Sequence, residues 1–112
     1  MTILHITHAS EWTDAQSKGY YSVPGLATEG FIHCSTPSQV VGVAERYYAG
    51  QHGLLLMVID PGRLESEVKY EPGTDKPDEL FPHVYGRINL DAITRVLEFE
   101  PDAAGKWNLP AL

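Results

Sequence analysis

The run Leu54-Leu55-Leu56-Met57-Val58-Ile59, which follows Gly53, decides the fold, because it is the longest apolar run in the chain. Strands that are buried on both faces have continuous apolar sequences, whereas half-buried strands alternate. Asp60-Pro61-Gly62 follows the run and is typical of a turn. The run therefore predicts a central strand that is covered on both faces, and it is far too short to cross a bilayer.

The first part of the chain predicts a strand followed by a short helix. Residues 2–7 alternate as a strand does, with Leu4 and Ile6 on the face that should lie in the core. Residues 10–18 predict a helix capped by the serine at its start. Gly19 then offers the left-handed conformation that commonly ends a helix.

A second strand and a second helix precede the central run. Residues 29–35 predict a strand, and residues 36–48 predict a helix. Thr36 can cap this helix, Pro37 suits its first position and Gln39 can close a capping box. The apolar residues at helical spacing, which we expect to be buried, are Val40, Val43, Ala44 and Tyr47.

Strands dominate the rest of the chain. Residues 68–71 predict a short strand, and residues 72–82, which carry three prolines, predict a loop that could act as a mobile flap. Residues 83–88 and 94–100 predict two closing strands, and residues 101–112 an irregular tail. Helices early and strands late predict an α+β fold, with two or three helices on a small mixed or antiparallel β structure. We expect one domain over the whole chain.

Composition restricts the function. The chain has 112 residues, a formal net charge of −7 and eight scattered Lys and Arg residues, so we expect no general nucleic-acid binding. One arginine in a pocket could still hold a small phosphate ester. The single cysteine, Cys34, excludes an internal disulfide. These features predict a cytoplasmic protein that does not associate with membranes, with a small-molecule ligand as its partner and an oligomeric state left open.

Polar residues recur on one face of three predicted strands. The faces carry His5 and Thr7 in the first strand, His33 and Ser35 in the second, and His83, Tyr85 and Arg87 in a late strand. If the three faces border one cleft, imidazole, hydroxyl and guanidinium groups would meet there. That set suits sugar hydroxyls and phosphate oxygens. Arg46 and Arg95 fall outside the predicted polar face.

Other interpretations of these residues remain. Each histidine could simply be solvated, and three imidazoles could hold zinc, although the spacing shows no metal motif and we expect no metal site. Cys34 could be a nucleophile, but its strand phase places it in the core as a small apolar residue. Glu29 and Glu71 could be general bases, yet acidic residues at strand edges are usually solvated.

Three strings of the sequence resemble a small bacterial family classed as domain of unknown function 952. They are Leu4-His5-Ile6-Thr7, Glu29-Gly30-Phe31-Ile32-His33-Cys34-Ser35 and Phe81-Pro82-His83-Val84-Tyr85-Gly86. The resemblance extends to about Val96. The family's fold is similar to the ADP-ribosyltransferase fold, a split β structure whose members bind NAD between two small sheets. The resemblance therefore implies an ADP-ribosyltransferase-like fold, with NAD as a substrate rather than a resident cofactor.

The resemblance also implies roles for single residues. His5 matches the first-strand histidine of the wider group, and the strand around His33 resembles that of the RNA 2′-phosphotransferase branch. The late-strand glutamate of the transferases is missing, and His83 stands near its place. We therefore expect binding of NAD, ADP-ribose or another ribose-containing molecule, with His33 or His83 as acid or base and Arg87 on a phosphate. Glycosyl or phosphoryl transfer, a non-catalytic binding module and, last, metal-assisted hydrolysis remain open.

Overall fold

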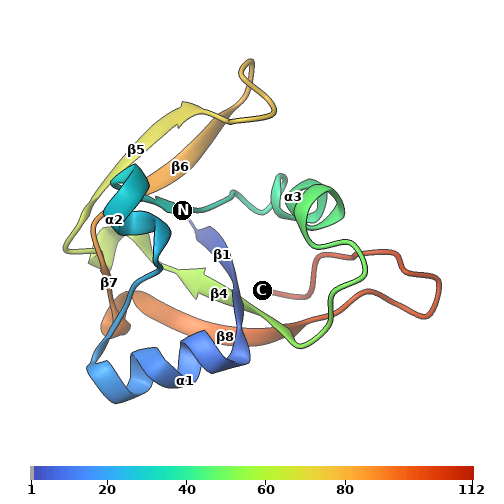
Figure 1. Ribbon diagram of the computed structural model, residues 1–112, viewed down its shortest axis with the longest axis horizontal. Coiled ribbons are helices and arrows are strands. Elements are labelled where there is room, and N and C mark those ends of the chain that lie inside the picture. Colours follow the sequence, from blue (N-terminus) through green and yellow to red (C-terminus); the bar gives the residue numbers. More distant parts are fainter. Residues whose placement is uncertain (1) are drawn as a thin grey trace.

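The central apolar run is the middle strand of a three-stranded sheet. The computed structural model describes residues 2–112. In it β4 (Leu54–Ile59) lies between β1 (Ile3–His8) and β8 (Ile93–Phe99) and is antiparallel to both (Figure 1). Every residue of β4 except Leu55 is buried. The predicted central strand, covered on both faces, is therefore confirmed.

The two faces of this sheet pack against different helices. On one face Leu4 and Leu56 belong to a cluster that includes Val40 of α3 (Val40–Tyr47). On the other face Ile3, Met57 and Ile59 belong to a cluster with Ala15 of α1 (Ala9–Lys18) and Tyr21. β1 therefore contributes to both core clusters, and its polar residues lie between apolar ones on a strand that is largely buried.

Two smaller sheets stand beside the first. One has the order β3 (Ile32–His33), β6 (Leu80–Tyr85) and β5 (Glu67–Pro72), and the other pairs β2 (Tyr20–Tyr21) with β7 (Ile88–Asn89). A bridge between Leu4 and Ser35 links β1 to the segment after β3. All strand pairs in residues 2–112 are antiparallel. The fold is α+β, as expected.

Three short helical pieces complete the described chain. They are α2 (Gly25–Glu29) and the 3-10 turns η1 (Pro61–Arg63) and η2 (Leu90–Ala92). α2 corrects the prediction that residues 29–35 form one strand, since only Ile32–His33 pair as β3. Gly30, at φ 87°, ends α2 and redirects the chain into that strand.

The helix boundaries follow local hydrogen bonds. α1 starts after His8, whose backbone N–H donates to Glu11, and not after Ser10 as predicted. At the start of α3 the Thr36 backbone N–H donates to the side chain of Gln39, which is the predicted half of the capping box. The expectation that Tyr47 is buried is wrong, because it is 49% exposed.

The C-terminal half is close to its prediction, with one strand broken. The predicted loop over residues 72–82 is confirmed over residues 73–79, which connect β5 and β6 in a hairpin, while residue 72 and residues 80–82 belong to those strands. The strand predicted over residues 83–88 is interrupted after Tyr85, since Gly86 has φ 149°. The irregular tail is anchored, because Trp107 is 3% exposed and its ring lies 5.0 Å from that of Phe99.

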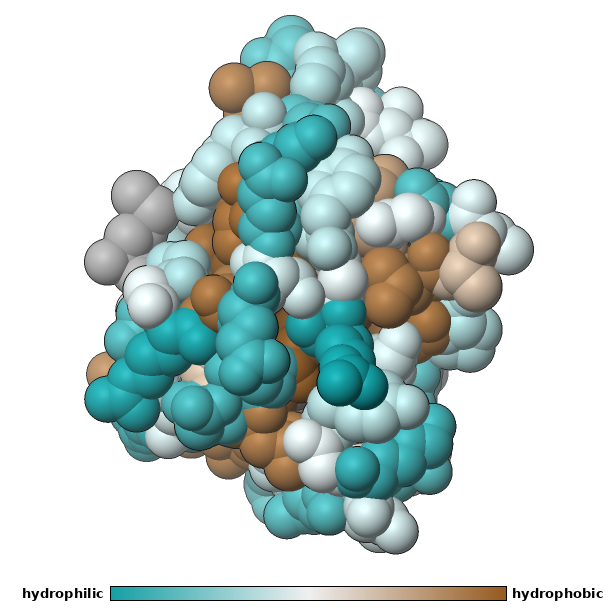
Figure 2. Space-filling model, turned by 90° about the vertical axis from the view of Figure 1, so that its left-hand side faces the viewer, coloured by the Kyte–Doolittle hydropathy of each residue, from teal (hydrophilic) through white to brown (hydrophobic). Residues whose placement is uncertain are grey.

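The arrangement leaves a hairpin projecting beside a helix. Figure 1 shows β5 and β6 extending from the body of the molecule so that their connection lies above α3. Figure 2 shows the side of the molecule that carries β5 and β7, where hydrophilic side chains cover most of the surface and apolar ones appear between them. No helix within residues 2–112 has the length and apolar character needed to span a membrane.

Candidate functional site

A cavity of about 520 Å³ lies where four elements meet. Its walls come from β1, the segment after β3, α3 and the β5–β6 hairpin. This volume falls in the range of small-molecule sites, which is about 300–1,000 Å³. Most of the wall is apolar or aromatic, and the aromatic contributors are Tyr47, Tyr48 and Phe81. A few polar groups interrupt it, as in sites that orient a ligand.

Three histidines from three strands line this cavity. They are His5 of β1, His33 of β3 and His83 of β6. His33 and His83 are direct partners in the β3–β6 register, and their ring centroids are 5.4 Å apart. The imidazole of His5 lies 2.6 Å, through Nδ1, from the backbone oxygen of His33. The structure thus brings together the three rings that the strand phases predict to converge.

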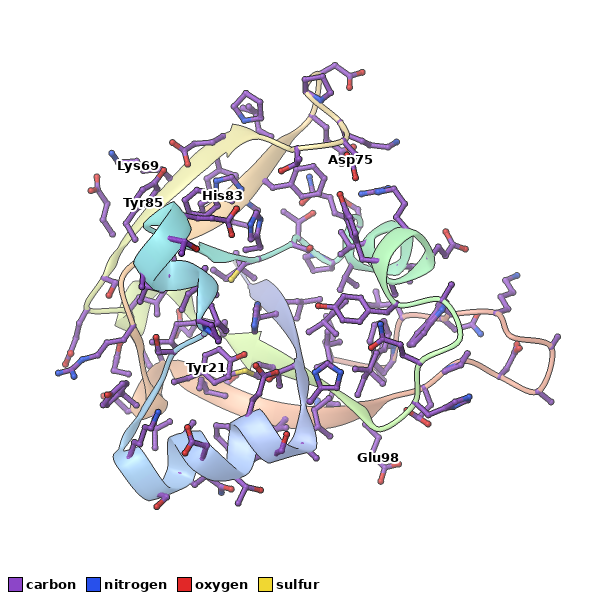
Figure 3. The ribbon with its side chains drawn as sticks, viewed as in Figure 1. Tyr21, Lys69, Asp75, His83, Tyr85 and Glu98 are labelled. Carbon is purple, nitrogen blue, oxygen red and sulfur yellow. The ribbon has the colours of Figure 1, made fainter. Side chains whose placement is uncertain are left out.

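His83 is oriented by a carboxylate on the neighbouring strand. Glu71 Oε1 of β5 lies 2.8 Å from His83 Nδ1 and 2.6 Å from the hydroxyl of Tyr85. Figure 3 shows His83 and Tyr85 close together on the hairpin. The hydrogen bonds from Tyr85 and His83 hold the pKa of the Glu71 carboxyl below its usual value, so it is ionised at neutral pH. An ionised carboxylate only accepts, and His83 Nδ1 must therefore carry a proton.

The second nitrogen of His83 has no protein partner. Residues 2–112 form no hydrogen bond to Nε2. Every fully buried side-chain N or O atom in these residues has a hydrogen-bond partner. Nε2 must therefore be accessible, although His83 as a whole is only 5% exposed. The same reasoning applies to the hydroxyl of Ser35, which also lines the cavity. A base and a hydroxyl are thus both available to a ligand.

His5 is held from both sides and presents no free nitrogen. Its Nδ1 must donate to the His33 carbonyl, which can only accept, and its Nε2 lies 2.8 Å from the hydroxyl of Tyr21. The Tyr21 hydroxyl also lies 2.9 Å from Thr7 Oγ1, and Thr7 donates to Glu11 at 3.1 Å. Because this hydroxyl has a single proton, Tyr21 donates it either to Thr7 Oγ1 or to Nε2 of a neutral His5 ring. Burial lowers the pKa of His5, which favours the neutral ring. His5 therefore forms part of the wall and is not free to exchange protons with a ligand.

His33 stands at the exposed edge of the cluster. Its Nε2 lies 3.1 Å from Glu29 Oε1, and about half of its side chain is exposed. The ring of Phe31 stacks on His83, with centroids 4.1 Å apart and planes 14° apart, and also contacts His33 edge-on. Phe31 therefore restricts the His83 ring from the side, while Glu71 restricts it through hydrogen bonding.

Cys34 is buried, as predicted. It is 3% exposed, and burial raises the pKa of its thiol to about 12. Its neighbours include Ile32 and Val84 in one apolar cluster. A thiol with so high a pKa is almost entirely protonated at neutral pH, so it is a poor nucleophile.

Three of the predicted ligand-binding residues lie outside the cavity wall. Thr7 is 1% exposed and is occupied with Tyr21 and Glu11. The hydroxyl of Tyr85 supports Glu71, and the guanidinium of Arg87 lies over the ring of Tyr20, 4.4 Å from its centroid. The alternation rule failed for Arg87 because the strand ends at Tyr85, before Gly86.

The structure places a different arginine at the cavity. Arg46 of α3 lines it, contrary to the expectation that this residue lies outside the site, and Lys76 of the hairpin lines it too. Neither could be found from strand phase, because one is on a helix and the other on a connection. Glu71 was recognisable: it precedes His83 by 12 positions across a hairpin, a separation that sets the two on neighbouring strands.

No metal site is evident in residues 2–112. No group of three His, Cys, Asp or Glu side chains there is arranged to hold an ion. Both ring nitrogens of His5 and Nε2 of His33 form hydrogen bonds within the protein. Nδ1 of His83 is hydrogen-bonded to Glu71. The histidine cluster is therefore described by its hydrogen bonds alone.

The comparisons with known proteins give one family and two similar structures of one protein, and none of them gives an activity. The chain matches the family described as "Protein of unknown function (DUF952)" over residues 6–96. The crystal structure of protein CC0527 from Caulobacter crescentus is 27% identical, with a TM-score of 0.84 over 97% of this chain and 95% of that one. The solution NMR structure of CC0527 is 28% identical, with a TM-score of 0.82 over 96% and 92% of the two chains. No curated protein matches.

Proposed function

The chain belongs to the DUF952 family of proteins of unknown function, and we propose that its cavity binds a nucleotide or another ribose-containing small molecule. NAD and ADP-ribose are the first candidates. The cavity has the volume for such a ligand, and Tyr47, Tyr48 and Phe81 offer flat surfaces for a base. Ser35 and His83 offer hydrogen bonds for sugar hydroxyls.

The observation that carries the proposal is the unpartnered Nε2 of His83. Glu71 fixes a proton on Nδ1, so in the neutral ring Nε2 carries the lone pair, and no residue in 2–112 hydrogen-bonds to it. An imidazole oriented in this way can accept a hydrogen bond from a ribose hydroxyl or remove its proton. His83 is therefore the proposed acid or base, and glycosyl or phosphoryl transfer is the proposed reaction class.

His33 is the weaker candidate for that role. Its Nε2 faces Glu29, and its ring lies at the open edge of the cavity. We assign it to ligand contact at the entrance. His5 holds the strand of His33 through the backbone oxygen, which makes His5 a positioning residue.

The resemblance to the ADP-ribosyltransferase fold supports NAD or ADP-ribose as the ligand. Those transferases use a late-strand glutamate that this chain lacks, and the nearest carboxylate is that of Glu71 on β5. Glu71 Oε1 already accepts from Tyr85 and His83, so it acts on a ligand through His83. This difference also favours the second candidate function, a binding or regulatory module that performs no reaction.

A thermal-shift screen with matched histidine variants tests the proposal. NAD and ADP-ribose should raise the unfolding temperature of the wild-type protein, since a ligand of the folded state stabilises it. His83→Gln should abolish or sharply reduce the shift. His52→Gln should not, because His52 is exposed and lies outside the cavity wall.

Chromatographic detection of products from NAD then separates an enzyme from a binding module. Product formation by the wild-type protein supports catalysis, and its loss in Glu71→Gln at a ligand concentration that saturates this variant assigns the reaction to the oriented His83. Binding without product supports the module. An unchanged unfolding temperature with every nucleotide and nucleoside tested would overturn the proposal.

A further inference from the structure

Basic residues outnumber acidic ones at the rim of the cavity, although the chain as a whole is acidic. The chain carries a formal net charge of −7, yet two of its eight basic residues, Arg46 and Lys76, line this one cavity. Neither forms an ion pair with a carboxylate in residues 2–112, whereas Lys18 and Arg63 do. Asp75 is the acidic residue of the rim. An anion entering the cavity would meet two cations that are not held in ion pairs with carboxylates of residues 2–112.

The two cations come from two different elements that line the cavity. Arg46 projects from the last turn of α3, and Lys76 belongs to the connection of the β5–β6 hairpin. Hydrogen bonds join the hairpin connection to the two ends of α3. The side-chain amide of Gln39 donates to Glu79 and to the backbone oxygen of Leu80, at 2.9 and 2.8 Å. The connection therefore has a fixed position with respect to the start of α3.

The second of these hydrogen bonds is formed by the residues next to Arg46 and Lys76 in the sequence. The hydroxyl of Tyr47 donates to the carboxylate of Asp75, which Figure 3 shows on the hairpin connection above α3. Tyr47 follows Arg46 in sequence, and Asp75 precedes Lys76. The hydrogen bond thus joins the two segments that carry the cations, and it provides the Asp75 carboxylate with a donor other than those cations.

We infer that Arg46 and Lys76 form a phosphate subsite, in which a phosphate or diphosphate group is held between α3 and the hairpin connection. Two cations on separate elements suit a tetrahedral group with several charged oxygens better than a planar carboxylate with a single charge. The sugar attached to the phosphate would then extend toward Ser35 and His83. The inference deepens the proposed function and rests on it for this orientation.

Calorimetric titration at fixed, low ionic strength tests the subsite with two probes. Inorganic pyrophosphate tests the rim alone, and ADP-ribose tests the rim together with the rest of the cavity. We expect Arg46→Ala and Lys76→Ala each to weaken both probes about tenfold, as the loss of a charge-assisted contact does. Arg46 and Lys76 are exposed, so both variants should fold.

Two charge-matched variants serve as controls. Arg87→Ala and Lys106→Ala remove the same charges from exposed positions outside the cavity wall, and each should change affinity less than about twofold through screened electrostatics. Equal losses in all four variants would overturn the subsite in favour of a diffuse charge effect. Adenosine, which has no phosphate, should bind the rim variants as it binds the wild-type protein.

The outcomes separate this inference from the proposed function. ADP-ribose binding that is unaffected by both rim variants would overturn the subsite and leave the proposed function standing. Pyrophosphate binding that depends on Arg46 and Lys76, without any nucleoside or nucleotide preference, would support the subsite and contradict the proposed function. If neither pyrophosphate nor ADP-ribose bound the wild-type protein, the subsite and the proposed function would both be overturned.

Discussion

Replacing Tyr21 by phenylalanine should destabilise the protein, because the Tyr21 hydroxyl links two buried or half-buried polar groups. The hydroxyl lies 2.8 Å from His5 Nε2 and 2.9 Å from Thr7 Oγ1. Thr7 keeps its hydrogen bond to Glu11, so the main loss is the partner of His5. An unpaired buried polar atom costs about 1–3 kcal/mol, and removing the buried hydroxyl itself recovers part of that. We expect a net loss of about 1–2 kcal/mol.

Urea unfolding measures this loss, and the neighbouring tyrosine provides the control. A loss of about 1–2 kcal/mol should lower the urea midpoint by roughly 1 M for a domain of this size. The hydroxyl of Tyr20 has no hydrogen bond in residues 2–112, so Tyr20→Phe should leave the midpoint nearly unchanged. If both variants matched the wild-type protein, Tyr21 would not anchor His5, and the description of His5 as a fixed part of the cavity wall would be wrong.

Three further outcomes follow from burial and packing. Cys34 should react with a small thiol reagent far more slowly in the native protein than in the urea-unfolded chain, since burial raises its pKa to about 12, and equal rates would contradict its place in the core. Burial lowers the pKa of His5, so the unfolded chain binds more protons than the folded protein just below pH 6.5. The free energy of unfolding should therefore fall as the pH drops through that value. In His5→Gln the unfolding temperature should depend less on pH between about pH 7.5 and 5.5. Trp107→Ala should cost about 3–5 kcal/mol in denaturant unfolding because its buried ring packs on Phe99, and an unchanged midpoint would mean that the tail is not part of the fold.

The strongly patterned parts of the fold could be predicted from sequence. The apolar run over residues 54–59 forms the central strand, and the helix that follows Thr36 starts with the expected contact from Gln39. The segment over residues 25–35 could not, because a five-residue helix and a two-residue strand are too short for either periodicity to show. The extent of the hairpin over residues 67–85 was obscured by its prolines, because Pro72 and Pro82 lie within the strands and only Pro77 lies in the connection.

The site could be predicted only as far as strand alternation holds. His33 and His83 meet because β3 and β6 pair in the phase that alternation implies, and the bridge between Leu4 and Ser35 brings β1 with His5 beside them. Cys34 takes the opposite phase into the core. Arg87 could not be placed, because the positive φ of Gly86 ends that alternation. Arg46 and Lys76 reach the cavity from a helix and from a connection. Their positions depend on tertiary packing, which no local pattern encodes.

Amide chemical-shift mapping with ADP-ribose tests the central claim most directly, namely that the histidine-lined cavity is a ligand site. Shifts should be largest at His33, Ser35 and His83 and should extend to the hairpin connection and α3. They should be small at Glu98 on β8, which Figure 3 shows far from His83 and Asp75. A spectrum that does not change, or one whose changes centre on β8 or α1 instead, would contradict the account.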